Sequence, residues 1–460
     1  MKRRSFIRHL SHAIGVPALL GTTGFSALAR SISEKAAENN KVLVLIYLQG
    51  GNDGLNTVVP LNQLPELNKA RSNVILPDHE LLELPGTELA LHPELGGLRT
   101  LFNEERLRII QNVGYPQQDF SHFRSTDIWM SGADADELVT SGWTGRYLSY
   151  KFPGYPEGYP NESAPDPLAV EIGHGSSLLF QGPEAAMSMV VKDPMDFYEL
   201  VENTNGVLPE GIAGEKLKHI RLVARQSKLY GEVVKNAANS VQQQQPYPDT
   251  GLAQQLKIVA QLIAGGLKTS LYLVNLRSFD THDNQVTEAD HTKGEHAQLL
   301  AEVDNAIMAF MRDLEFLNVD DKVTGMTFSE FGRRIISNGS RGTDHGAAAP
   351  LFVFGNHVVP GVLGDNPEIP IHATAKDNLP WQYDFRQVYS SVLQQWLKLS
   401  ETDTTGVLFD NFAVLPVIKT NPPTYSDSVI NSINLTVFPN PVRNRATIRF
   451  RSAGEDVVIA

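Results

Sequence analysis

The sequence of 460 residues contains no cysteine. Disulfide bonds, thiolate nucleophiles and cysteine-ligated zinc are therefore excluded together. Any metal ion would have to be bound by histidine, aspartate and glutamate, and these ligands favour hard or borderline divalent ions. The missing cysteine thus narrows the possible chemistry before any motif is considered.

Acidic residues outnumber basic ones, with 52 Asp and Glu against 39 Lys and Arg, so the formal net charge is −13. We therefore expect no nucleic-acid partner and no general binding to anionic membranes. An anionic substrate remains compatible with this charge, because a bound metal ion reverses the local field. The 42% hydrophobic and 20% charged residues are typical of a soluble globular protein, and the length suits one large α/β domain or two ordinary ones.

The first 29 residues are similar to an export signal. Lys2-Arg3-Arg4-Ser5-Phe6-Ile7 resembles the twin-arginine signal, a weakly apolar stretch covers residues 13–28, and Ala27-Leu28-Ala29 offers a cleavage site. The alternative, a short membrane anchor, is disfavoured because the stretch is short and rich in Gly, Ser and Thr. No later segment indicates a stable membrane span. We expect the twin-arginine export machinery as a partner, and the periplasm, the cell surface or the medium as the location.

Apolar runs that alternate with amphipathic helical patterns predict a parallel sheet. The run at 42–47 leads into Gly50-Gly51-Asn52-Asp53-Gly54, which suits a central strand followed by a sharp turn. Ligands of open α/β sheets bind at the carboxyl ends of strands, where this turn lies. Strands are expected at 42–47, 107–113, 168–172, 178–180, 269–276, 322–328 and 350–354, and helices at 95–102, 121–132, from 142, 214–241, 252–263, 298–317 and 384–397.

Four turns carry acidic, histidine or hydroxyl side chains. Carboxylates and neutral imidazoles are ligands for divalent ions, and a serine at a helix amino terminus can act as a nucleophile beside them. One or two such ions could hold the attacking and leaving oxygens of an ester. The turns contain Asp53, Ser121-His122, Asp280-Thr281-His282 and Asp344-His345.

Seven segments resemble, in the same order, the exported family catalogued as domain of unknown function 1501. They are QGGNDGLNTVVP, DFSHFRSTDIW, SGWTGRYL, FDTHDNQ, TFSEFGRR, GTDHG and DFRQVYSSVL, and they span residues 40–400. GTDHG is also similar to the T-x-D-H-G segment of the alkaline phosphatase and sulfatase superfamily. The resemblance implies an alkaline phosphatase-like α/β fold, a three-layer α/β/α sandwich with a mainly parallel central sheet.

The same resemblance implies a set of metal ligands for a divalent ion, which would be Zn, Mg, Mn or Ca. The set consists of a first aspartate, an Asp-His pair, and a second Asp and His that are two residues apart here and four apart in the superfamily. In that order these residues are Asp53, Asp344, His345, Asp280 and His282. The candidates for a further histidine are His296, His122 and His372.

The expected catalytic residues are Ser121, His122 and Arg124. Ser121 lies where the resemblance places the nucleophile, but the sulfatase signature C/S-x-P-x-R is absent, so formylglycine chemistry is not expected. Arg124, like Arg146 and Arg386, could hold an anionic group or form a structural salt bridge. Ser121 could equally be only a helix cap.

The acidic candidates also have structural interpretations. Asp53 could only form a turn, Asp344 and His345 could be a surface pair in a polar loop, and the turn at Asp280 could cap a helix. Glu330 could bind metal or pair with a neighbouring arginine. The sequence leaves these alternatives open.

The composition changes near residue 421, where VFPNPVRNRATIRF resembles the start of a type IX secretion sorting domain. This segment covers about half of the usual module, with an expected strand at 446–451, and makes the type IX secretion machinery a possible partner. The expected organisation is a signal peptide at 1–29, an α/β domain at 30–420, and a linker with a small C-terminal β segment at 421–460.

Two functions are compatible with these patterns. The first is an exported metal-dependent hydrolase that cleaves an anionic phosphate or sulfate ester with a serine nucleophile. The second is a non-catalytic cell-surface binding or assembly protein that keeps the same fold.

Overall fold

The computed structural model describes residues 41–173, 175–194, 228–243, 245–420, 436–438, 447–452 and 455–459. The chain divides into two units, Met1–Ile418 and Lys419–Ala460, and each is described by itself. The expected export signal lies outside the described residues, as do most residues of the expected sorting segment.

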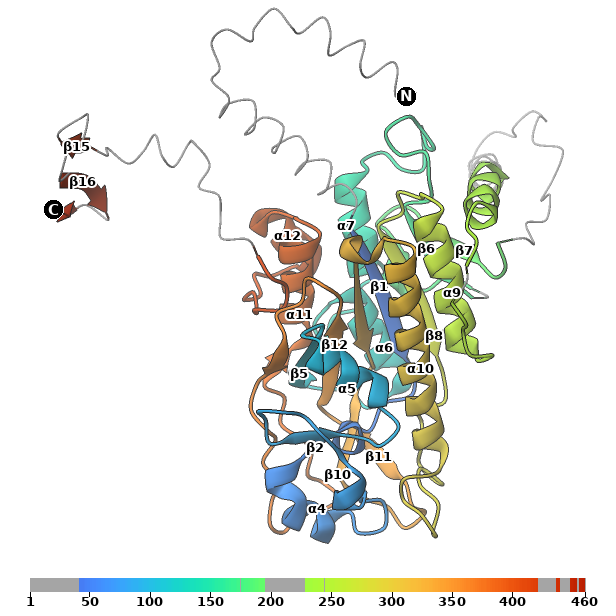
Figure 1. Ribbon diagram of the computed structural model, residues 1–460, viewed down its shortest axis with the longest axis vertical. Helices are drawn as coiled ribbons and strands as arrows, with labels where there is room; N and C mark the ends of the chain where they lie inside the picture. The colour runs from blue at the N-terminus through green and yellow to red at the C-terminus, as the bar shows by residue number, and fades with distance from the viewer. Residues whose placement is uncertain are drawn as a thin grey trace, which may run out of the picture. The chain divides into compact units, whose positions relative to one another are not determined.

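A nine-stranded, mainly parallel sheet forms the centre of the first unit (Figure 1). Its strands are β1 (Val42–Leu48), β5 (Leu107–Gly114), β6 (Ala169–Ile172), β7 (Ser188–Val191), β8 (Leu271–Leu276), β9 (Val323–Phe328), β12 (Ala349–Phe354), β13 (Gly361–Leu363) and β14 (Tyr383–Asp384). The spatial order is β13-β5-β12-β9-β1-β8-β6-β7, and β14 pairs with β5. β1 is parallel to both of its neighbours, whereas β12 is antiparallel to β5 and β9.

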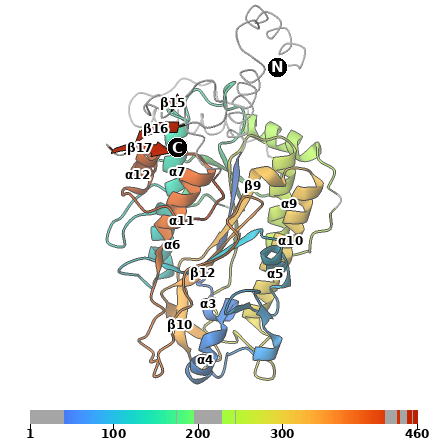
Figure 2. The same ribbon diagram turned by 60° about the vertical axis from the view of Figure 1, so that its left-hand side comes forward.

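All seven residues of β1 are buried, because helices cover both faces of the sheet. Val44 and Ile46 belong to one hydrophobic core, and Leu43 and Leu45 belong to the other. The first face is covered by α5 (Gly96–Asn103), α9 (Gly251–Ala264) and α10 (Glu295–Phe316), and the second by α6 (His122–Ser131), α7 (Trp143–Lys151), α11 (Phe385–Ser391) and α12 (Glu401–Leu408), as Figure 2 shows. The expected three-layer α/β/α sandwich with a mainly parallel sheet is confirmed.

Smaller elements lie beyond the carboxyl end of β1, and several of them share a third core. They include a three-stranded antiparallel sheet and a hairpin. The elements are α3 (Gly54–Thr57), α4 (Leu64–Ala70), β2 (Val58–Pro60), β3 (Leu82–Glu83), β4 (Leu89–Leu91), β10 (Gly332–Ser337) and β11 (Thr343–Gly346). Short helical turns complete the unit at η1 (Leu61–Gln63), η2 (Asp78–Glu80), η3 (Leu178–Phe180), η4 (Asp320–Lys322) and η5 (Val392–Trp396).

Most of the expected elements are present, with two errors. The run at 178–180 is a 3₁₀ turn, η3, because three apolar residues bury equally well in a helical turn. The polar segment at 342–346 is strand β11, which pairs with β10 and carries Asp344 and His345. Of the helix expected at 214–241, residues 214–227 lie outside the described residues.

The second unit contains a small antiparallel sheet of β15 (Thr436–Phe438), β16 (Thr447–Ser452) and β17 (Glu455–Ile459). The strand expected at 446–451 corresponds to β16. Within the described parts of the chain, none of the helices has the length and apolar character needed to cross a membrane.

Candidate metal centre

The candidate site lies beyond the carboxyl ends of three neighbouring strands, β9, β1 and β8. These strands lead to Glu330, to the glycine turn at Gly50, and to Asp280. Gly50 has φ +127°, and a Cβ there would lie 2.4 Å from the backbone nitrogen of Asp280. Only glycine therefore lets the two turns pack against each other, and this contact fixes the backbone of Asp280.

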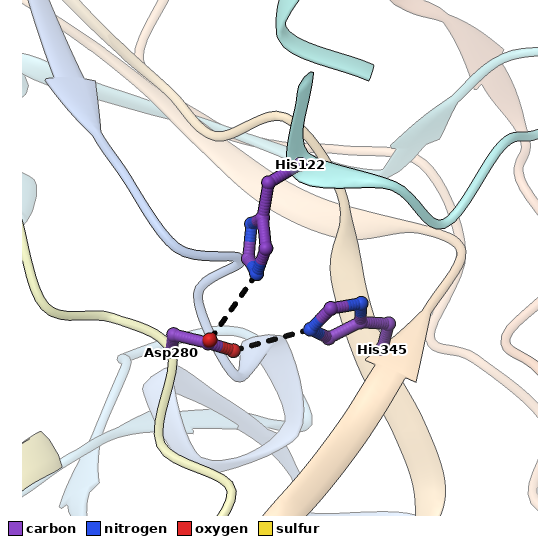
Figure 3. Close-up of side chains that lie close together, drawn as sticks. All are labelled: His122, Asp280 and His345. Atoms are coloured by element: carbon purple, nitrogen blue, oxygen red, sulfur yellow. Dashed lines mark hydrogen bonds and ion pairs between the residues drawn. The ribbon is translucent and has the colours of Figure 1, made fainter. Parts of the chain in front are cut away.

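Three side chains from separate segments converge in front of this edge (Figure 3). The Asp280 carboxylate lies with Oδ2 3.2 Å from Nε2 of His122 and with Oδ1 3.1 Å from Nε2 of His345. His122 is the first residue of α6, and His345 lies on β11. His282 adjoins this group, since its Nε2 is 3.1 Å from Asp280 Oδ1 and 2.8 Å from Nε2 of His345.

The other nitrogen of each of these three imidazoles faces an acceptor. Nδ1 of His122 is 2.7 Å from Glu330 Oε1, and Nδ1 of His345 is 2.7 Å from the Phe120 carbonyl oxygen. Nδ1 of His282 is 3.1 Å from Asp344 Oδ1. A carbonyl or an ionised carboxylate can only accept, so each Nδ1 carries the hydrogen. A neutral ring would then direct an Nε2 lone pair into the cluster, whereas a protonated ring would donate from Nε2 to Asp280.

Charge around the Asp280 carboxylate keeps it ionised. Burial opposes ionisation, but the hydrogen bond and charge of Arg333, with His345 and His122, lower the pKa of Asp280 to about 2. The hydrogen bond to Glu330 raises the pKa of His122 above its ordinary value. Burial lowers the pKa of His345. The cluster therefore combines one carboxylate anion with imidazoles that differ in their affinity for protons.

This donor set fits a divalent cation. Nε2 of His122 is buried without a hydrogen-bond partner and is directed at Asp280. The lone pairs of His282 and His345 would repel each other at 2.8 Å unless the two nitrogens shared a proton or both bound one metal ion. Imidazole nitrogens with one carboxylate oxygen suit a borderline ion such as zinc, whereas magnesium and calcium prefer oxygen-rich sites.

The buried Arg333 holds the segments around the cluster in place. Its guanidinium donates to the Gly51 carbonyl at 2.6 Å, to the Thr343 carbonyl at 2.8 Å and to Asp280 Oδ1 at 2.8 Å. It also donates to the carbonyls of Gly50 and Phe279. One side chain on β10 thus ties together the turns after β1 and β8 and the strand that carries His345.

Asp53 lies outside this cluster. Its carboxylate is almost completely buried and accepts two hydrogen bonds from the Arg71 guanidinium, at 2.6 and 3.2 Å. Gln285 donates a third bond at 2.6 Å. Burial raises the pKa of Asp53, but Arg71, His296 and Gln285 lower it overall. Because Arg71 and Gln285 occupy its oxygens, a metal-ligand role for Asp53 stays a prediction from the sequence and is not included in the candidate site.

The other predicted residues occupy different positions around the cluster. Asp344 contacts His282 and Asn338 but not Asp280. Ser121 is the exposed residue that precedes α6, and its hydroxyl makes no capping hydrogen bond. Arg124 donates to backbone carbonyls at residues 134, 135 and 137, so its guanidinium is used to hold that loop.

Of the three histidines considered as a further ligand, only His122 reaches the cluster. His296 is buried against Asn52, with 2.9 Å between Nε2 and Oδ1, and burial lowers the pKa of His296 to about 4. His372 is exposed in the loop before α11. Among the described residues Glu330 forms no ion pair with an arginine, and it accepts from His122 and from the Gly50 amide.

Comparison with known families supports part of the expected relationship. A family model described as a protein of unknown function (DUF1501) matches residues 225–404. The matched region contains Asp280, His282, Glu330 and His345, and His122 precedes it. No curated protein sequence matches the chain.

Solved structures in the alkaline phosphatase and sulfatase group are similar to this chain at low identity. A protein in the alkaline phosphatase superfamily from Vibrio parahaemolyticus has 10% identity and a TM-score of 0.40, with 91% of this chain and 79% of that chain covered. The PsFucS1 sulfatase from Pseudoalteromonas sp. has 12% identity and a TM-score of 0.35, with coverage of 84% and 76%. An alkaline phosphatase from the Antarctic bacterium TAB5 has 10% identity and a TM-score of 0.26, with coverage of 69% and 92%. Such similarity says nothing about the chemistry of the site. The family whose model matches part of the chain, residues 225–404, is DUF1501, the family that the sequence motifs resemble.

Proposed function

We propose that this protein is a metal-dependent hydrolase of phosphate or sulfate esters. The observation that carries the proposal is the convergence of His122, His345 and Asp280, with His282 beside them, at the carboxyl edge of the sheet. Each imidazole is oriented by an acceptor at Nδ1 and directs Nε2 inward. Metal-binding histidines are usually oriented in this way, by an acceptor at the other ring nitrogen.

The side chains of the cluster would bind the ion, with Nε2 of His122 and His345 and the Asp280 carboxylate as ligands and His282 as the fourth. A bound ion would act as a Lewis acid on the ester group. Glu330 and the Phe120 carbonyl would hold the hydrogens on Nδ1 and so keep both Nε2 lone pairs free. Zinc is the ion that this donor set favours.

Ser121 is the proposed nucleophile. Its Oγ would form the bond to phosphorus or sulfur while the bond to the alcohol oxygen breaks, and the alcohol would leave with a proton from water. The hydroxyl proton of Ser121 would pass to solvent, because Oγ is exposed and has no hydrogen-bond partner among the described residues. Water would then cleave the serine ester and regenerate the hydroxyl.

The geometry favours one ion rather than two. A second cation near the turn after β1 would need Asp53 or the carbonyls of Gly50 and Gly51 as ligands. Arg71 already neutralises Asp53, and Arg333 already occupies those carbonyls. We therefore propose a mononuclear centre with two buried guanidinium groups beside it.

A non-catalytic binding protein is the second candidate. It is favoured by the free Ser121 hydroxyl, because none of the described residues offers it a general base. The same metal cluster would then serve only to bind an anionic ligand or to stabilise a surface for a partner.

Export through the twin-arginine machinery to the periplasm or beyond is proposed from residues 1–29, and delivery by the type IX machinery from the C-terminal segment. Cell fractionation of a variant with both Arg3 and Arg4 changed to Lys tests the first point. We expect the variant to stay in the cytoplasm, and unchanged export would contradict this route.

Metal analysis and ester assays test the proposed function. We expect about one zinc per chain in the wild-type protein, loss of the ion in Asp280→Asn, and retention of the ion in the exposed-surface control Asp410→Asn. With 4-nitrophenyl phosphate and 4-nitrophenyl sulfate, Ser121→Ala should lose turnover but keep the ion, whereas the exposed control Ser163→Ala should keep both. Metal binding without turnover of any ester would favour the second candidate, and absence of metal would exclude both.

A further inference from the structure

A pocket of about 480 Å³ opens directly beside the candidate metal centre. His122 and Asp280 form part of its wall, so a molecule in the pocket would touch the cluster. The remaining wall comes from the end of β1, from the first turns of α6 and from the loop that follows β8. Two of these lining side chains, Phe123 and Arg277, give the pocket an exposed aromatic ring and a positive charge beside the carboxylates of Asp127 and Asp280.

Phe123 is the most exposed large hydrophobic side chain in the described part of the chain, with 88% of its surface accessible. It follows His122 in the first turn of α6, and its ring contacts no other aromatic ring of the described residues. An isolated apolar side chain on a surface needs no explanation by itself. An aromatic ring next to a candidate metal ligand, on the wall of the same pocket, offers a flat face to a ligand.

Arg277 supplies the only permanent positive charge among the residues that line this pocket. It is exposed in the loop after β8, three residues before Asp280, and it forms no hydrogen bond or ion pair with the described residues. The other arginines near the site are occupied: Arg333 by carbonyls and Asp280, and Arg124 by loop carbonyls. Arg277 is therefore the cation that remains available to an incoming anion.

We propose that Phe123 and Arg277 form the substrate subsite of this centre, and that the substrate is an anionic ester whose alcohol part is a ring. The ring would stack on Phe123, and Arg277 would bind the anionic group that the cluster holds from the other side. An alkyl ester would leave the Phe123 face exposed and would bind more weakly. This inference rests on the proposed function, because it assigns a substrate class to the same centre.

Calorimetric titration of the zinc-loaded protein with phenylphosphonate and methylphosphonate tests the subsite without turnover, because neither compound can be hydrolysed at its P–C bond by this chemistry. We expect the wild-type protein to bind phenylphosphonate about tenfold more tightly than methylphosphonate. Phe123→Ala should reduce this ratio to about twofold or less and leave the affinity for methylphosphonate unchanged. Leu138→Ala, a matched control at a residue that is 84% exposed elsewhere, should keep the ratio.

Arg277→Gln should weaken the binding of both phosphonates to a similar degree, by about tenfold, and should make the remaining binding less sensitive to salt. A wild-type ratio near one, or a ratio that Phe123→Ala does not change, would overturn the ring subsite. Failure of the zinc-loaded protein to bind either phosphonate would overturn it as well. Failure of the proposed function has a different signature, namely the absence of zinc or of ester turnover.

Discussion

Asp53 and Asp280 follow two neighbouring strands, β1 and β8, yet their carboxylates have different surroundings. Asp53 is 1% exposed, and Arg71 and Gln285 occupy its oxygens. Asp280 is 44% exposed on its side chain and faces the Nε2 atoms of three imidazoles. The two residues share a residue type and a position in the topology, but only Asp280 keeps an open side.

This contrast shows which property separates a structural carboxylate from a candidate ligand. A carboxylate that is enclosed by a guanidinium and an amide contributes to folding through a buried ion pair. A carboxylate that is anchored on one side, here by Arg333, and open on the other can accept an ion. The residue type and the position after a strand are the same in both cases. The two carboxylates differ because different partners approach them from distant segments.

The largest expected difference between the two carboxylates is in stability. Asp53→Asn should lower the free energy of unfolding of the metal-free protein by about 3–5 kcal/mol, because it leaves Arg71 buried without a counter-charge. Asp280→Asn should lower it by about 1 kcal/mol or less, since Asp280 is partly exposed and four backbone carbonyls still accept from Arg333. Guanidinium denaturation measures both. Equal losses would show that Asp53 is not a structural charge.

The second prediction concerns how the free energy of unfolding depends on pH through the buried His296. His296 is neutral in the fold with a pKa of about 4, whereas an unfolded histidine has its ordinary value near 6.5. The unfolded state binds more protons between these values, so the free energy of unfolding should fall as the pH falls from about 6.5 to about 4, by roughly 3 kcal/mol from this residue. Denaturation at several pH values tests this, with His296→Gln expected to show a shallower slope. If His296→Gln leaves the slope of the free energy of unfolding against pH unchanged, other groups cause the loss of stability in acid.

The third prediction concerns Glu330, which orients the candidate ligand His122. Glu330 is completely buried and accepts from Nδ1 of His122 and from the Gly50 amide. Glu330→Gln keeps the shape but removes the charge that orients His122, so the affinity for zinc should fall about 10- to 100-fold. Competition with a coloured chelator measures this affinity. Unchanged affinity would show that the charge of Glu330 does not support zinc binding through His122.

The smallest effect is expected at Asp344, which supports His282 from an exposed position. Asp344→Asn should weaken zinc binding by less than about tenfold, because an exposed carboxylate is screened by solvent and the amide oxygen can still accept from Nδ1. The same chelator competition applies. A loss as large as that of Glu330→Gln would place Asp344 among the direct ligands.

The sequence was sufficient to predict the sheet, because β1, β8 and β9 are continuous apolar runs that end in polar turns. It also indicated candidate metal ligands near the carboxyl edge of the central sheet, namely Asp280, His282 and His345. It could not show that Arg71 reaches Asp53, because no local pattern connects an arginine at the end of α4 with a turn 18 residues earlier. A sequence shows which side chains could bind a metal ion. It does not show whether a residue from another segment already bonds to them.

Sequence patterns left the roles of His122 and Glu330 open. His122 was expected as a catalytic residue and as one of three candidates for a further metal-binding histidine, and the packing of α6 turns its ring toward Asp280. Glu330 was open between two roles, and the structure shows a third, because the Gly50 amide and His122 approach it together. Both outcomes depend on how α6 and the turn after β1 pack, which single-residue patterns do not encode.

The contacts of Arg333 also bear on how the protein would acquire the proposed ion. Its hydrogen bonds to the backbone at Gly50, Gly51, Phe279 and Thr343 connect the walls of the centre without help from any bound species. These hydrogen bonds hold the side chains of the candidate centre in place, and we expect loading and release of the proposed ion to require no refolding. Exchange rates would then depend on ligand deprotonation and access from solvent, so metal content would follow the ions available in the compartment where the folded chain resides.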